Sequence, residues 1–122
     1  MANPVRHFEI AGKDDGPLFD FYKTLFGWTM TRHEPTGYGM VGTEGFGIGE
    51  MTGGLCQSPD GSNWVTLYIQ VADIDKALAD VAARGGKTIM EKMSVPNGPT
   101  VALFADPAGN TMGLVEPMQP PS

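Results

Sequence analysis

The order of predicted elements repeats once along the chain, and this repeat constrains the fold more than any other feature. The glycines that end two predicted helices, Gly27 and Gly85, lie 58 residues apart, and the strands before these helices, at Val5 and Val65, lie 60 residues apart. Each half reads as a strand, a helix and three further strands. Each half is too small to bury both faces of its own sheet, so the pattern predicts two modules that share one core.

In the first half, alternation predicts a strand over Val5–Ala11 with His7 and Glu9 on the same face. Apolar side chains at helical spacing predict a helix over Leu18–Phe26, with one stripe facing the core and Gly27 as its end. Three further strands are predicted at Trp28–His33, Tyr38–Thr43 and Phe46–Met51.

A turn-rich connector then follows, since Gly53-Gly54 and Ser58–Ser62 are rich in turn residues. We divide the single domain of residues 1–122 into module one at about 4–55, a connector at 56–63 and module two at about 64–117. Module two is predicted to contain a helix capped by Asp73 and four strands, at Trp64–Val71, Lys87–Lys92, Thr100–Ala105 and Asn110–Glu116.

Composition excludes several classes of protein. With 122 residues, 41% hydrophobic and 18% charged, the chain suits one globular domain. Its 14 acidic and 8 basic side chains give a net charge of −6, which argues against nucleic-acid or anionic-membrane partners. The single Cys56 excludes an intrachain disulfide framework. There is no apolar run of about 18 residues and no signal-peptide pattern, so we expect a cytoplasmic protein that does not span a membrane.

Several motifs, taken in their order and spacing, resemble the vicinal-oxygen-chelate superfamily over nearly the whole chain. This superfamily includes glyoxalase I, bleomycin-resistance proteins and extradiol dioxygenases. The stretches that carry the resemblance are Val5–Ile10, Phe21-Tyr22 with Leu25–Trp28, Val71–Asp75, Gly85–Lys87 and Asp106–Asn110 with Gly113-Leu114.

The resemblance implies an α+β fold of two βαβββ modules that form a cupped, mixed or antiparallel sheet. It also implies ligand sites inside the cup and a homodimer, and the open edges of such sheets give a physical reason for pairing. Because this scaffold hosts isomerases, dioxygenases and passive drug binders, membership alone leaves the function open.

Metal-dependent relatives take one His or Glu from each of four strands, and the resemblance places these four positions here. The first falls on His7 and the second on Glu50. The third falls on Thr66 and the fourth on Gly113, which offer a neutral hydroxyl and no side chain. We therefore expect an incomplete metal site and no cofactor, with a weakly held divalent ion as the alternative.

The candidate site residues follow from these positions and from strand alternation. His7 and Glu50 are candidates for acid–base catalysis as well as for metal binding. Strand alternation puts three polar side chains of the 64–71 strand on one face and Val65, Leu67, Ile69 and Val71 in the core. The candidate ligand-binding residues are Glu9, Trp28, Thr66, Tyr68 and Gln70.

Three functions remain open at this point. The first is a protein that binds a small cationic or aromatic ligand in the cup without a complete metal site. The second is a glyoxalase-like lyase or isomerase, or a dioxygenase-type enzyme, with an incomplete or dimer-completed divalent metal site, or with His7 and Glu50 acting without metal. The third is an interaction module without a ligand.

Overall fold

The computed structural model describes residues 2–34, 36–42 and 51–117. This part of the chain contains eight strands and two helices, which confirms the predicted α+β class. It divides into two compact units, residues 6–66 and residues 1–5 with 67–122. Among the described residues, neither helix is long and apolar enough to cross a bilayer.

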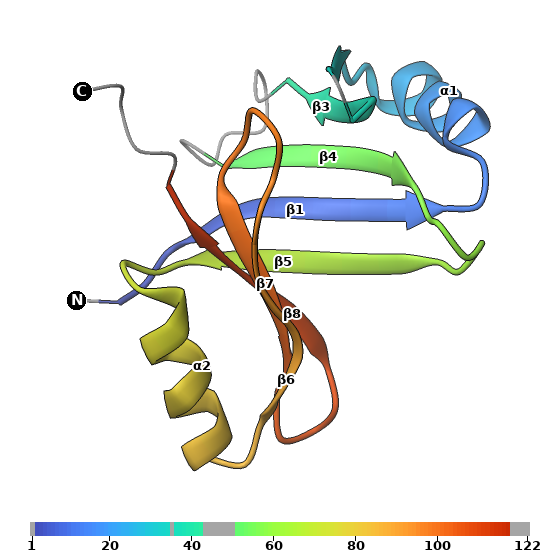
Figure 1. Cartoon of the computed structure of the whole chain (residues 1–122). Helices are drawn as coiled ribbons and strands as arrows, with labels where there is room; N and C mark the ends of the chain where they lie inside the picture. The colour runs from blue at the N-terminus through green and yellow to red at the C-terminus, as the bar shows by residue number, and fades with distance from the viewer. Residues whose placement is uncertain (1, 35, 43–50, 118–122) are drawn as a thin grey trace, which may run out of the picture. The chain divides into compact units, whose positions relative to one another are not determined.

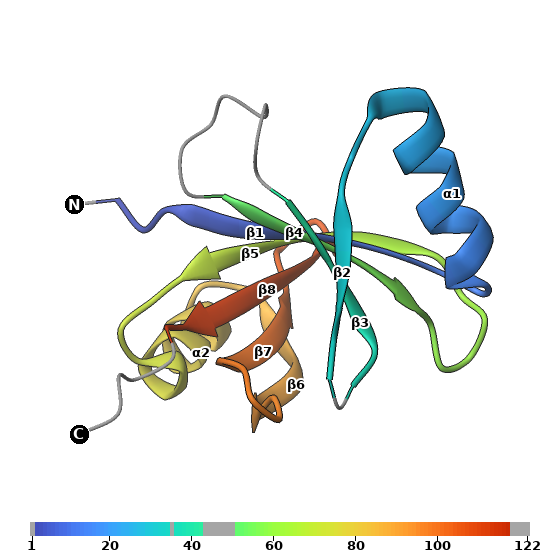
Figure 2. The ribbon, with the colours of Figure 1, turned by 90° about the horizontal axis from the view of Figure 1, so that it is seen from above.

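The first unit contains one strand–helix–strand–strand–strand series. Its sheet has the order β2-β3-β4-β1, with β1 parallel to β4 and the other pairs antiparallel. Figure 1 shows β1 and β4 side by side and pointing the same way, and Figure 2 shows β2 beside β3. The elements are β1 (Val5–Gly12), α1 (Asp15–Phe26), β2 (Met30–His33), β3 (Tyr38–Val41) and β4 (Thr52–Gln57).

The last strand of this unit differs from the prediction. The strand expected at residues 46–51 lies outside the described residues except for Met51, which is not in a strand. The strand that pairs with β1 is β4, in a stretch that the sequence pattern assigned to turns. Phe8 and Tyr38 place their rings where side chains at positions 53 and 54 would lie. Glycine fits at these two positions of the strand because it has no side chain.

Helix α1 ends at Phe26 as its sequence predicts, but it begins at Asp15, three residues before the predicted start. Gly27 has φ +72°, and its N–H donates to the carbonyl oxygen of Lys23. The expected buried stripe is wrong, since no α1 residue is fully buried and Phe21 and Leu25 are 52% and 60% exposed. Arg32 of β2 holds the helix by donating to Asp15 Oδ2 at 2.7 Å.

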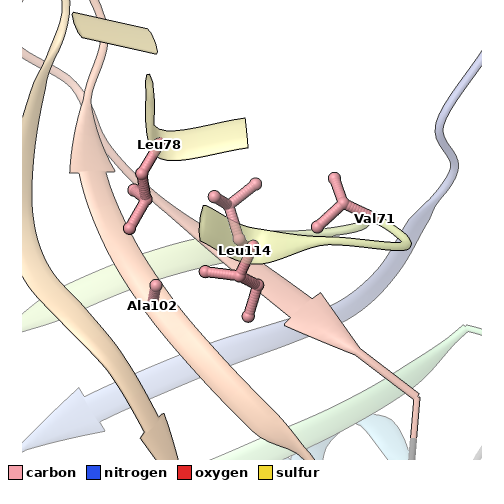
Figure 3. Close-up of a cluster of buried hydrophobic side chains, with 5 residues drawn as sticks. Val71, Leu78, Ala102 and Leu114 are labelled. Atoms are coloured by element: carbon pink, nitrogen blue, oxygen red, sulfur yellow. The ribbon is translucent and has the colours of Figure 1, made fainter. Parts of the chain in front are cut away.

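The second unit repeats the same series, with its sheet in the order β5-β8-β7-β6 and β5 parallel to β8. Asp73 caps α2, because its carboxylate accepts the backbone N–H of Lys76. Helix α2 packs on the sheet through a buried cluster (Figure 3) of Val71, Ile74, Leu78, Ala102 and Leu114. The elements are β5 (Trp64–Gln70), α2 (Ile74–Ala83), β6 (Lys87–Ser94), β7 (Thr100–Ala105) and β8 (Thr111–Glu116).

The burial of side chains on β5 agrees with the prediction at the C-terminal end of the strand and differs from it at the N-terminal end. Ile69 and Val71 do pack against the α2 cluster. Val65, which belongs to the first unit, is 71% exposed, and Leu67 is 40% exposed. Tyr68 is buried instead, because its ring lies over Gly113 of the neighbouring β8.

Candidate ligand-binding site

Five polar side chains of the first unit form one continuous hydrogen-bonded network. Thr52 Oγ1 lies 2.6 Å from His7 Nδ1, and His7 Nε2 lies 2.8 Å from Tyr38 Oη. Tyr38 Oη donates to Glu9 Oε1 at 2.9 Å, and Trp64 Nε1 donates to Glu9 Oε2 at 2.7 Å. All five residues are half-buried, so each keeps part of its surface exposed. We call these residues the polar network.

Strand register brings these residues together. In the parallel pair of β1 and β4, His7 lies opposite Thr52 and Glu9 lies opposite Gly54. Since Gly54 has no side chain, the ring of Tyr38 lies across it and its hydroxyl reaches both His7 and Glu9. The network therefore depends on one glycine and on the pairing of three strands.

The opposite face of this sheet packs against α1. Phe8 follows His7 in β1 and therefore points the other way. Its ring lies 5.6 Å from that of Trp28, and Trp28 stacks on Tyr22 of α1 at 4.7 Å with an interplanar angle of 14°. The structure thus places Trp28, a predicted ligand-binding residue, in the packing of α1 and not in the polar network.

His7 is uncharged at neutral pH. Burial lowers the pKa of its imidazole from 6.5 to about 4. A neutral imidazole carries one hydrogen, so one ring nitrogen donates and the other accepts.

The partners of His7 fix which nitrogen carries the hydrogen. The Glu9 carboxylate can only accept, so the hydroxyl hydrogen of Tyr38 goes to Glu9. Tyr38 Oη then accepts from His7 Nε2–H, and His7 Nδ1 accepts from Thr52. Thr52 Oγ1 also lies 3.3 Å from the carbonyl oxygen of Arg6, which is the longer of its two contacts. We assign the hydrogen of His7 to Nε2.

Cys56 lies on β4 and remains a thiol. Burial, together with the charges of Glu9 and Asp15, raises its pKa to about 12. A thiol in this state is not a nucleophile at neutral pH.

The described donor set does not fit a divalent metal ion. Both ring nitrogens of His7 are engaged by Thr52 and Tyr38, and no group of three or more His, Cys, Asp or Glu side chains in the described ranges could hold an ion. Glu50, the second predicted ligand and the other predicted catalytic residue, lies outside the described residues. The metal-binding role of His7 and Glu50 stays a prediction.

The remaining predicted residues lie on β5. Thr66, at the end of the first unit, is only 4% exposed, which leaves little of it for a ligand to contact. Tyr68 and Gln70 belong to the second unit. There the Tyr68 ring lies against Gly113, and the backbone N–H of Gln70 donates to the carbonyl oxygen of Pro4 at 2.9 Å.

Sequence reasoning found His7 and Glu9 but did not select Tyr38, Thr52 or Trp64 for the site. Alternation within β3 and β4 gives the faces of Tyr38 and Thr52 only once the strand register is known. The sequence carried no signal for that register, because Gly53-Gly54 resembled a turn.

Comparison with known proteins identifies the family. The family model described as Glyoxalase/Bleomycin resistance protein/Dioxygenase superfamily matches residues 5–114. This is the family that the sequence motifs resemble. A curated relative, the anthracycline biosynthesis protein DnrV of Streptomyces peucetius, is 30% identical over 118 residues. The match covers 84% of this chain and 42% of the relative, so the chain spans less than half of that protein's length.

Solved structures with the same fold are similar over nearly their whole length. A hypothetical protein from Bacillus halodurans C-125 has a TM-score of 0.73 at 17% identity, with 100% of this chain and 99% of that chain covered. Methylmalonyl-CoA epimerase from Mycobacterium tuberculosis also has a TM-score of 0.73, at 15% identity, with 97% and 90% covered. At these identities the likeness extends to the fold alone.

Proposed function

Since this chain belongs to the Glyoxalase/Bleomycin resistance protein/Dioxygenase superfamily, we propose that it binds a small organic ligand on the polar network without a complete metal site. The ligand is aromatic or cationic, and it is held beside Glu9. The observation that carries this proposal is the fixed position of the Glu9 carboxylate between Tyr38 Oη and Trp64 Nε1.

Two features support binding over catalysis. His7, with a pKa of about 4, is a weak base at neutral pH, where a general base works best with a pKa near the working pH. Cys56 stays protonated and offers no nucleophile. The network supplies instead a half-buried carboxylate held in one orientation, which suits recognition of a ligand group.

The curated relative supports an aromatic ligand. DnrV is named as an anthracycline biosynthesis protein, and anthracyclines are planar polycyclic compounds. A planar polycycle that lies on the half-exposed ring of Trp64, beside the Glu9 carboxylate, would gain apolar contact from the indole ring and polar contact from the carboxylate.

A titration of the wild-type chain with an anthracycline and with planar aromatic amines tests the proposal. We expect saturable binding by calorimetry and a rise in the melting temperature, because a ligand at 100 times its Kd stabilises the folded state by about 2.7 kcal/mol. The indole N–H signal of Trp64 should shift in an NMR titration, while that of Trp28, on the opposite face, should not.

Substitution gives an independent test of the same site. Glu9→Gln keeps the size of the side chain but removes its charge, and we expect it to weaken binding about fivefold or more. Asp20→Asn, an equivalent change at an exposed position of α1, should leave binding unchanged. If no compound of either class binds to the wild-type chain, the proposed function is wrong.

The metal-dependent alternative has its own test. It requires His7 to exchange its contact with either Thr52 or Tyr38 for a metal ion, with Glu50 as a second ligand. A stoichiometric divalent ion in protein purified without chelators, lost on His7→Ala, would favour that alternative over the ligand-binding proposal.

A further inference from the structure

The polar network uses each of its hydrogen-bond donors within itself. The hydroxyl of Thr52, the N–H of His7, the hydroxyl of Tyr38 and the indole N–H of Trp64 each have an acceptor in the network. Because a hydrogen is directed to one acceptor at a time in a short linear bond, these groups have no second hydrogen for a ligand.

Acceptor capacity, in contrast, remains. A carboxylate has about four lone-pair positions, and Glu9 receives one hydrogen on each of its two oxygens. The side chain is half-buried, so a ligand group can reach it. A ligand that carries only hydrogen-bond acceptors would find the Glu9 oxygens, which are also acceptors. It would lose its hydrogen bonds to water and gain none from the network.

From these contacts we infer that the site selects ligands that carry a hydrogen-bond donor, an O–H or N–H group, and that Tyr38 is the residue that sets this selectivity. The inference rests on the proposed function and names the ligand class of that site. If His7 were protonated, Nδ1 would donate to Thr52 Oγ1 and the Thr52 hydroxyl would turn to the carbonyl oxygen of Arg6 at 3.3 Å, so the network would still offer no donor to a ligand.

Tyr38 sets the selectivity because its hydroxyl links the imidazole of His7 to the carboxylate of Glu9. Its oxygen accepts the hydrogen of His7 Nε2, and its hydrogen goes to Glu9. Tyr38→Phe removes the acceptor for His7 Nε2–H and leaves that hydrogen for a ligand oxygen. The variant should therefore admit ligands that bring only an acceptor.

Three naphthalene compounds that differ in one substituent provide the probes. The aminomethyl compound is a charged donor, the hydroxymethyl compound is a neutral donor, and the acetyl compound is a neutral acceptor. We expect the two donors to bind wild-type protein about tenfold tighter than the acetyl compound, as measured by calorimetry or NMR titration.

The variant experiment uses a matched pair. In Tyr38→Phe the preference for donors should fall below about threefold, because the acetyl compound gains the hydrogen bond from His7. Tyr22→Phe makes the same chemical change in the stacked ring of α1, outside the network, and should keep the tenfold preference.

The possible contrary results separate the two proposals. If none of the three compounds binds although an anthracycline does, the inference is wrong and the proposed function stands; if the anthracycline and the amines also fail to bind, both are wrong. Equal binding of the acetyl compound to wild-type protein, or binding of the aminomethyl compound alone, would overturn the inference and leave the proposed function intact. An unchanged preference in Tyr38→Phe would remove Tyr38 from its assigned role.

Discussion

At the scale of single residues, His7 links folding to pH. Its pKa is 6.5 in the unfolded chain and about 4 in the folded protein, because burial disfavours the charged imidazole. Between these values the unfolded chain binds more protons than the folded one. The contribution of neutral His7 to stability is therefore fully present above pH 6.5 and is lost as the pH falls towards 4.

This linkage gives a measurable loss. A pKa difference of this size corresponds to about 3 kcal/mol as an upper limit. Urea unfolding at pH 7 and at pH 4.5 should show about 2 kcal/mol of that loss for wild-type protein and a clearly smaller loss for His7→Gln. Equal losses in wild type and His7→Gln would contradict the neutral state assigned to His7.

The sequence predicted part of the site and left out the rest for a geometric reason. Alternation alone put His7 and Glu9 on one face, and the structure joins both to one network. Tyr38 and Thr52 lie 31 and 45 residues from His7 along the chain. Their contacts with His7 depend on strand register, which no local pattern reports.

At the scale of elements, local chemistry predicted the helices well and one strand poorly. Asp73 and Gly27 act as helix ends as expected, since caps depend on nearby residues only. Strand β4 was missed because Gly53-Gly54 is typical of a turn. Within the sheet these glycines instead leave room for two aromatic rings, an effect that depends on tertiary contacts.

Gly54→Ala tests the link between β4 and the polar network. The added methyl group would meet the ring of Tyr38, so we expect a loss of about 1–3 kcal/mol in the free energy of unfolding and weaker ligand binding. Gly16→Ala in α1 adds a methyl group with no atom within 4 Å and should not destabilise the fold. Equal stability of the two variants, measured by denaturant titration, would contradict the close approach of Tyr38.

Asp73→Ala tests the cap of α2. The variant loses the hydrogen bond from the backbone N–H of Lys76 and should be destabilised by about 1 kcal/mol. Asp14→Ala, at the corresponding position of α1, removes a side chain that makes no cap hydrogen bond. Its effect should stay within about 0.5 kcal/mol, and an equal loss in both variants would show that the two caps do not differ.

At the scale of the whole molecule, the repeated element order predicted two modules, and the motifs, through their order and spacing, indicated the family and with it the α+β class. The expected homodimer is a separate prediction. Helix α1 exposes Phe21, Leu25 and Phe26 at 52%, 60% and 61%, an apolar surface that pairing would cover. Sedimentation equilibrium should give twice the chain mass, and the mass of one chain at every concentration would contradict this expectation.

The proton on His7 is the most direct test of the polar network, because the selection of donor ligands follows from its position. Nitrogen chemical shifts of the imidazole at neutral pH report which ring nitrogen carries the hydrogen. We predict a neutral ring with the hydrogen on Nε2, facing Tyr38. A hydrogen on Nδ1, or a doubly protonated ring, would contradict the assigned network.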